Sequence, residues 1–412
     1  MHEGPTLQAT ELLVLLLLAS SLVGILAHRV NVPYTVALVL CGMLLGATGA
    51  IHGQALTPSL VLFVFLPGLL FEAAFHLHLD HLKRTFGAVV ALAGPGLLIT
   101  MGIVACMVHW VLGTDWAVSI LLGAMVSATD PIAVLAVFRR LGVPKRLSTL
   151  VEGESLFNDG VALVVFSSAL GVAVGGHFDA GQSVVAFLVA VAGGVVVGGT
   201  SGFVASRVTA HVDDHLVEMT LATALAYGTY LVSEFFGVSG VLATITAGLV
   251  FGNYGRARGM STRTQEALDD LWEYAAFLLN SLVFLLLGAA FDISRLLADV
   301  AAVGVVVVAT TVGRAVAVYG LGTGATLLRI AVLPRRWRHV VFWSGLRGAL
   351  SLAMALSLPP DTPQRDLLVT LVAGVVLVTI LVQGSTIDPI ARRLIPIRHG
   401  GSELLPDPAR AH

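Results

Sequence analysis

Long apolar stretches recur along the whole chain, and they constrain its fold more than any other feature. A helix that crosses a bilayer needs about 20 mostly apolar residues. Thirteen stretches of this kind lie at residues 9–28, 33–50, 57–77, 85–112, 115–140, 147–176, 181–208, 215–236, 238–254, 263–291, 296–330, 337–358 and 363–392. The sequence therefore predicts an all-α polytopic membrane protein with about thirteen transmembrane helices.

The composition agrees with a chain that lies almost entirely in lipid. Charged residues make up 12% of the 412 residues, about half the share in a soluble domain. The net charge of −2 gives no basic surface for a nucleic-acid partner. The loops between the stretches are too short for a soluble domain. We therefore expect one membrane domain over residues 1–392 and a short cytoplasmic tail over 393–412.

The basic residues predict the orientation in the membrane. With thirteen spans, nineteen of the 23 Lys and Arg residues lie on the side of the C-terminus. Only Arg295 and Arg365 lie on the other side, while Arg314 and Arg347 lie inside spans. Because cytoplasmic loops carry the excess of Lys and Arg, the N-terminus is expected outside and the C-terminus in the cytoplasm. This pattern suits a bacterial plasma membrane.

Several ionisable residues lie inside the predicted spans, where charge is costly and usually functional. They are Glu72, Asp130, Glu152, Glu154, Asp159, Arg314 and Arg347. We interpret Glu154 and Arg314 as a structural ion pair, and Arg347 as a structural charge that compensates neighbouring charges or helix ends. Glu152 is left open between a funnel-lining and a structural role. The histidines, His76 among them, lie mostly in loops or at helix ends, where interfacial solvation is the favoured interpretation.

Asp159 is expected near the middle of the bilayer. It lies about twelve residues from the cytoplasmic end of its helix, which corresponds to a depth of about 18 Å. Ser155 precedes it by four residues and therefore shares its helix face. The spacing predicts a polar face directed toward the protein interior.

Two spans carry features that break a helix. Pro131 follows Asp130 and removes a helical hydrogen bond, so residues 127–130 are expected to unwind. Gly345 and Gly348 bracket Arg347 in the twelfth stretch. Matching broken helices indicate the binding site of a transporter. The offset of seven predicts two inverted repeats of six helices around a linker helix at about 181–208, with the broken fifth and twelfth helices crossing.

Carboxylate, hydroxyl and carbonyl oxygens without a Cys or His cluster suit a hard cation. If one carboxylate binds either the cation or a proton, the two compete, and their movements are coupled in opposite directions. An intramembrane aspartyl protease and a passive channel are the alternatives. No paired catalytic aspartate motif supports the protease, and a channel needs no protonatable site at its midpoint.

At this point the motifs resemble those of a known family. The segments are SATDPIAVLAVF at Ser127–Phe138 and EGESLFNDGVALVVF at Glu152–Phe166. FLPGLLFEAAF at Phe65–Phe75, GVSGVLATITAGLVFG at Gly237–Gly252, NSLVFLLLG at Asn280–Gly288 and WSGLRGALSLA at Trp343–Ala353 support them. In this order they resemble the NhaP-type branch of the monovalent cation/proton antiporters, which includes the animal sodium/proton exchangers.

The resemblance implies a homodimer and a division of each protomer. A dimerisation part would span about 1–84 and 215–292, and a mobile core part about 85–176 and 296–392. The implied sodium ligands are Asp159, Ser155, the Thr129 main-chain oxygen and Glu72, with Asp130 close by or acting through water. In the same family Glu154 and Arg314 form a structural ion pair.

The Asn158-Asp159 pair resembles the signature of electroneutral exchange of one sodium for one proton. No cofactor is expected beside the transported sodium or lithium and the proton. Potassium/proton exchange on the same scaffold remains an alternative, because ligand types alone do not separate the two ions.

Overall fold

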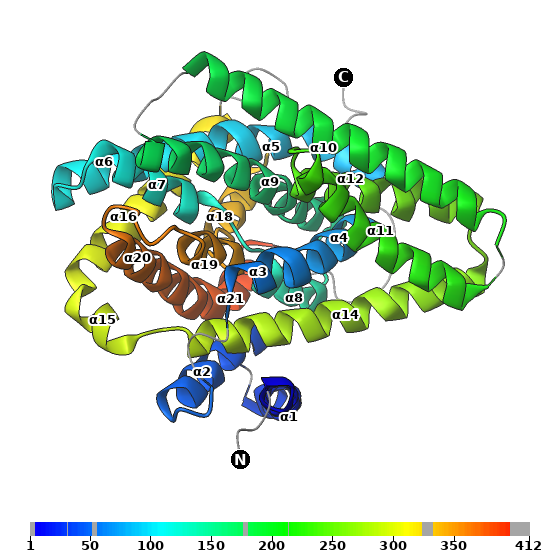
Figure 1. Ribbon diagram of the computed structural model, residues 1–412, viewed down its shortest axis with the longest axis horizontal. Helices are drawn as coiled ribbons and strands as arrows, with labels where there is room; N and C mark the ends of the chain where they lie inside the picture. Colours follow the sequence, from blue (N-terminus) through cyan, green and yellow to red (C-terminus); the bar gives the residue numbers. More distant parts are fainter. Residues whose placement is uncertain are drawn as a thin grey trace.

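The computed structural model describes residues 5–30, 32–51, 56–175, 180–212, 214–323 and 333–395. Within these ranges every regular element is a helix and no strand occurs, which confirms the all-α prediction (Figure 1). The tail beyond residue 395 and the end of the stretch at 296–330 lie outside the described residues.

The helices follow the predicted stretches closely. Their bounds are α1 Pro5–Val30, α2 Tyr34–Ala47, α3 Pro58–Leu60, α4 Leu66–His76, α5 Leu79–Ala91, α6 Leu97–Leu112, α7 Trp116–Ser127, α8 Ile132–Leu141, α9 Lys145–Gly175, α10 Ala180–Thr209, α11 His215–Phe235, α12 Gly240–Val250, α13 Arg256–Arg258, α14 Thr262–Ala289, α15 Ile293–Ala298, α16 Val300–Ala315, α18 Arg335–Trp343, α19 Ala349–Leu356, α20 Arg365–Val378 and α21 Gly384–Leu394. Five π-helical segments continue these helices: η2 Val61–Phe65, η3 Leu92–Gly96, η4 Phe251–Gly255, η5 Val316–Leu321 and η6 Thr379–Gln383.

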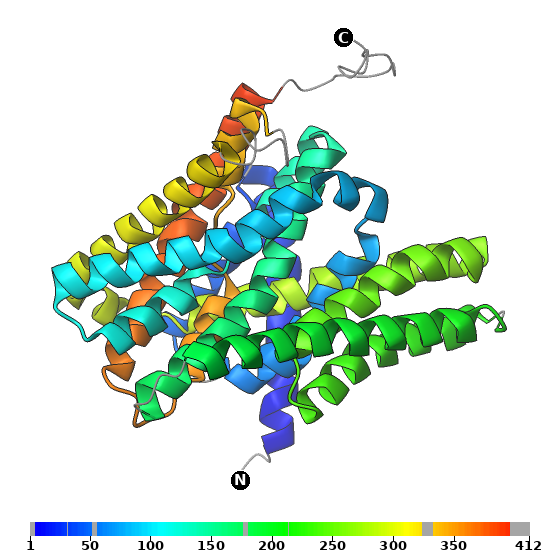
Figure 2. The same ribbon diagram turned by 90° about the horizontal axis from the view of Figure 1, so that it is seen from above.

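The multi-span architecture is confirmed, whereas the count of thirteen stays a prediction. Among the described residues, nine helical segments are long and apolar enough to cross a membrane, and Tyr34–Ala47 is a shorter apolar helix. The first turn of α1 and the last turn of α21 lie far apart in Figure 2.

One helix is longer than the sequence predicts. The stretch expected at 85–112 belongs to a continuous helical run over Leu79–Leu112. Its first turns include the charged Lys83 and Arg84, which a search for apolar residues leaves out. Pro95 lies inside this run within η3. Proline has no backbone N–H to donate, and the π turn accommodates the missing helical hydrogen bond.

Small residues bring the helices together. A Cβ atom on Gly42 of α2 would contact the backbone oxygen of Leu285 and approach the Cα of Gly288 to 3.0 Å, both on α14. Gly198 of α10 lies equally close to the backbone of Ala243 in α12. Such close backbone approach is the usual basis of helix association in lipid. In Figure 1, α10 runs along the upper edge of the molecule and α14 across its lower part, with α1 and α2 beyond α14.

Two groups of buried apolar side chains hold the helices. The larger group extends over most of the described chain. The smaller one contains the four aromatic residues Phe71, Phe75, Phe251 and Trp272, with the Phe71 and Trp272 rings 4.8 Å apart. It joins α4, η4 and α14, so the helix that carries Glu72 is fixed to its neighbours by large rigid rings.

The contact between α2 and α14 provides a test of the packing. Gly42→Ala should lower the melting temperature in detergent, because the added methyl group meets the α14 backbone and overpacking costs about 1–3 kcal/mol. Gly102→Ala on α6 is the matched control, since nothing lies within 4 Å of its Cβ position and alanine favours helix. Equal melting temperatures for the two variants, measured by intrinsic fluorescence, would contradict this packing.

Candidate functional site

Two helix breaks meet inside the protein. The first separates the end of α7 at Ser127 from the start of α8 at Ile132, and the second separates α18 from α19 over residues 344–348. The Asp130 backbone N–H donates a 2.8 Å hydrogen bond to the Leu346 carbonyl. The breaks therefore lie against each other, and four helix ends meet in one region.

Asp130 lies at the N-terminal ends of two of these helices. Its Oδ1 accepts a 3.0 Å hydrogen bond from the Ile132 N–H at the start of α8. Gly348, just before α19, lies so close that a Cβ atom there would collide with the Asp130 carboxylate. Because helix N-termini carry partial positive charge, the carboxylate is stabilised by both helices.

Arg347 lies at the opposite, C-terminal ends. Its Nη1 donates a 2.6 Å hydrogen bond to the Gly345 carbonyl, and its Nε donates to the Val126 carbonyl in the last turn of α7. The side chain is only 1% exposed. A buried cation in this place offsets the partial negative charge of the α7 and α18 ends.

Glu154 and Arg314 form a second buried charge pair. Nη1 of Arg314 contacts Oε1 of Glu154, and Nη2 donates a 2.9 Å bond to Oε2. The same Nη2 donates a 2.8 Å bond to the carbonyl of Val341 in α18. The pair thus connects α9, α16 and α18 directly behind the break.

Side chains of α9 fix the unwound residue Thr129. The Ser155 hydroxyl donates a short hydrogen bond to the Thr129 carbonyl. Asn158 holds the same residue from both sides, because its Oδ1 accepts from the Thr129 N–H at 3.3 Å and its Nδ2 donates to Thr129 Oγ1 at 3.2 Å. The orientation of the Thr129 carbonyl is therefore set by α9.

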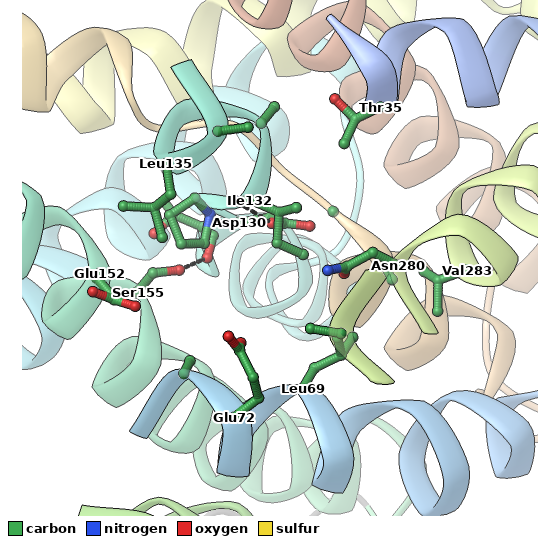
Figure 3. A pocket seen from close by; sticks show the side chains of 18 of the residues that line it. Thr35, Leu69, Glu72, Asp130, Ile132, Leu135, Glu152, Ser155, Asn280 and Val283 are labelled. Carbon is green, nitrogen blue, oxygen red and sulfur yellow. Dashed lines mark hydrogen bonds between the residues drawn. The ribbon is translucent and has the colours of Figure 1, made fainter. Parts of the chain in front are cut away.

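A cavity of about 430 Å³ lies beside these residues. The residues singled out from the sequence that line it are Glu72, Thr129, Asp130, Pro131, Glu152, Ser155 and Asp159. Glu154 and Asn158 are buried and do not line it. Figure 3 shows the Glu72 side chain extending into the space from α4, opposite Asp130 and Ser155.

Asp159 and Glu152, which lies about two helical turns nearer the start of α9, differ from the other acids of the site, because neither carboxylate has a hydrogen-bond partner among the described residues. Asp159 is partly exposed and lines the cavity, whereas Asp130 is bonded to α8 and Glu154 to Arg314. Within the described part of the chain, no protein group donates a hydrogen bond to the Asp159 carboxylate. Its oxygens are therefore available to a bound ion or a proton.

The cavity reaches from the site toward one end of α8. It extends from Asp159 to Arg139 and Arg140, which lie in the last turn of α8. The distribution of basic residues predicts that this end faces the cytoplasm. The site would then be accessible from the cytoplasmic side in this conformation.

Three polar residues of the cavity were not predicted from the sequence. Thr35, Asn280 and Ser351 line it, and each has a buried side-chain oxygen without a hydrogen-bond partner among the described residues. Buried polar atoms normally have partners, so these oxygens suit water or a hydrated ion. Asn280 is the first residue of one of the family segments and could have been predicted as a site residue. Thr35 and Ser351 are not distinguished in the sequence from other hydroxyl residues of apolar helices.

Comparisons with known proteins agree over nearly the whole chain. Residues 15–393 match the family described as sodium/hydrogen exchanger, transmembrane. The Na(+)/H(+) antiporter ApNhaP of Aphanothece halophytica is 40% identical over 365 residues, 88% of this chain and 70% of the relative. The Na(+)/H(+) antiporter NhaH of Halobacillus dabanensis is 36% identical over 397 residues, 93% of this chain and 97% of the relative.

A solved structure shares the fold. The sodium proton antiporter MjNhaP1 from Methanocaldococcus jannaschii at pH 8 matches with a TM-score of 0.78 and 23% identity, over 94% of this chain and 99% of that chain. The family match and the curated relatives lead to one conclusion: the chain belongs to the transmembrane sodium/hydrogen exchanger family.

Proposed function

We propose that this chain exchanges sodium, or lithium, for protons across the membrane, and that both bind in turn at Asp159. One observation carries the proposal: the Asp159 carboxylate lines the cavity without a protein hydrogen bond in the described chain, on the helix face that also presents Ser155. A membrane carboxylate without a partner is costly, and a cation or a proton removes that cost.

The surrounding oxygens suit a hard monovalent cation. The proposed sodium ligands are the carboxylates of Asp159 and Glu72, the Ser155 hydroxyl and the Thr129 carbonyl. In the structure the Ser155 hydroxyl donates to that carbonyl. Because a cation needs lone pairs from both oxygens, binding requires the hydroxyl proton to turn away.

Competition at one carboxylate supplies the coupling. A proton on Asp159 removes the negative charge that attracts sodium, and bound sodium disfavours the proton. If the site changes sides only when neutralised, each sodium that crosses is exchanged for a proton. The neutral side chain of Asn158 adds no second charge to move, which supports a one-for-one, electroneutral exchange.

Alternating access would require movement within the protomer. We infer that the core part, about residues 85–176 and 296–392, moves against the dimerisation part, about 1–84 and 215–292, in a homodimer. The cavity toward Arg139 and Arg140 would then represent the inward-open state. The proposed setting is a bacterial plasma membrane with the N-terminus outside.

Potassium is the less favoured substrate. The curated relatives are named Na(+)/H(+) antiporters, and none of these names mentions potassium. The oxygen ligands themselves would accept either ion, since selectivity depends on cavity size and ligand field. Sodium is therefore proposed from the relatives, and the carboxylate mechanism from the site.

Asp159→Asn should abolish exchange, because the amide neither takes up a proton nor offers a negative charge to sodium. The measurement is the recovery of a pH-sensitive dye in acidified proteoliposomes after sodium, lithium or potassium is added. Asp270→Asn is the matched control, since this carboxylate is exposed on α14. Exchange by Asp159→Asn at the wild-type rate would overturn the proposed mechanism.

Electroneutral exchange should not respond to voltage. The rate of sodium-driven proton movement is expected to stay constant when a valinomycin-clamped potassium gradient changes the membrane potential, because no net charge crosses. A rate that follows the imposed potential would show that net charge crosses the membrane in each cycle, which would contradict one-for-one exchange.

A further inference from the structure

His76 is the last residue of α4 and lies one helical turn after Glu72. An oxygen atom that can accept a hydrogen bond lies next to each of its ring nitrogens. Its Nδ1 lies 3.0 Å from the Glu72 carbonyl oxygen and 3.4 Å from the Glu72 carboxylate oxygen Oε1. Its Nε2 lies 3.2 Å from Oδ1 of Asp269 on α14. A carbonyl and an ionised carboxylate only accept hydrogen bonds, so the ring acts as a donor on both sides.

Asp269 is itself held in place. Arg256 of α13 donates to both of its carboxylate oxygens, at 3.1 Å to Oδ2 and through a shorter contact to Oδ1. The same guanidinium lies 4.5 Å above the Phe75 ring, and Phe75 directly precedes His76. The contacts form a closed loop from α4 through α13 and α14 back to α4, which fixes the imidazole.

This loop of contacts limits the conformations of the Glu72 side chain. Its Oε1 faces the imidazole, and its side chain is 14% exposed on the wall of the cavity. Other carboxyl and guanidinium groups that line the same cavity are those of Asp130, Arg139, Arg140, Glu152, Asp159 and Glu273. An unrestrained Glu72 would be free to take other rotamers.

We propose that His76 is a positioning residue for sodium binding: its Nδ1, bonded to the Glu72 carbonyl, also contacts Oε1 of the Glu72 carboxylate and so keeps Oε2 directed into the cavity. The sequence had placed His76 among the interfacial histidines. The inference rests on the proposed function, in which Glu72 is a sodium ligand. Outer partners that orient a ligating carboxylate affect metal affinity by about 10–100-fold.

Two conservative variants separate the two contacts of the ring. His76→Asn keeps an N–H donor near the Nδ1 position and loses the contact with Asp269, whereas His76→Gln keeps a donor near the Nε2 position and loses the one with Glu72. His76→Gln and His76→Ala should raise the KM for sodium about tenfold with little change in maximal rate. His76→Asn should stay close to wild type.

His81→Ala is the matched control, because His81 lies in the first turn of α5 and has no hydrogen bond or ion pair with Glu72 in the part of the chain that the structure describes. Combining His76→Ala with Glu72→Gln tests the route of the effect. If His76 acts through Glu72, the double variant has the KM of Glu72→Gln alone. Melting temperatures of all variants show whether any of them has lost its fold.

Three results would overturn the inference. These are a His76→Gln variant with wild-type KM, a double variant whose KM exceeds that of Glu72→Gln by the full His76→Ala factor, and a Glu72→Gln variant with wild-type KM. Asp159→Asn in the same assay separates this failure from that of the antiport mechanism. Inactive Asp159→Asn leaves the mechanism standing without the His76 role, whereas active Asp159→Asn overturns the mechanism itself.

Discussion

The structure depends on the need to satisfy backbone polar groups where two helices are broken inside the membrane. Lipid offers no hydrogen bonds, so irregular backbone at this depth must be covered by protein or water. The two breaks contact each other through Asp130 and Leu346. The Asp130 carboxylate offsets the partial positive charge of the N-terminal helix ends, and the Arg347 guanidinium offsets the partial negative charge of the C-terminal ends. These charges stabilise the crossing, and the Thr129 carbonyl, which accepts from Ser155, belongs to a residue on the wall of the cavity.

Much of this arrangement follows from local sequence. The spans are visible because each needs its own apolar run, and the first break is visible because Pro131 lacks an N–H. The polar face of Ser155 and Asp159 follows from helical spacing alone. The helical run from Leu79 was missed in part, since its charged first turns do not differ from a loop in composition.

Contacts between segments that are distant in the chain could not be predicted from the sequence. The partner of His76 is 193 positions away, and no periodicity connects it with Asp269. Thr35 and Ser351 are ordinary hydroxyl residues in apolar helices, and their unpaired oxygens become notable only when the cavity is present. The Glu154–Arg314 pair was anticipated from the two charges inside spans and matched the resemblance, whereas the additional bond to Val341 depends on how α16 packs against α18.

The central claim is that sodium and a proton share Asp159, and proton release on sodium binding tests it most directly. Purified protein in weakly buffered detergent, brought to a pH at which the site is protonated, is titrated with sodium chloride in the presence of a pH indicator. The account predicts proton release that saturates with sodium and is absent in Asp159→Asn. Sodium binding without proton release in the wild-type protein would contradict a shared site.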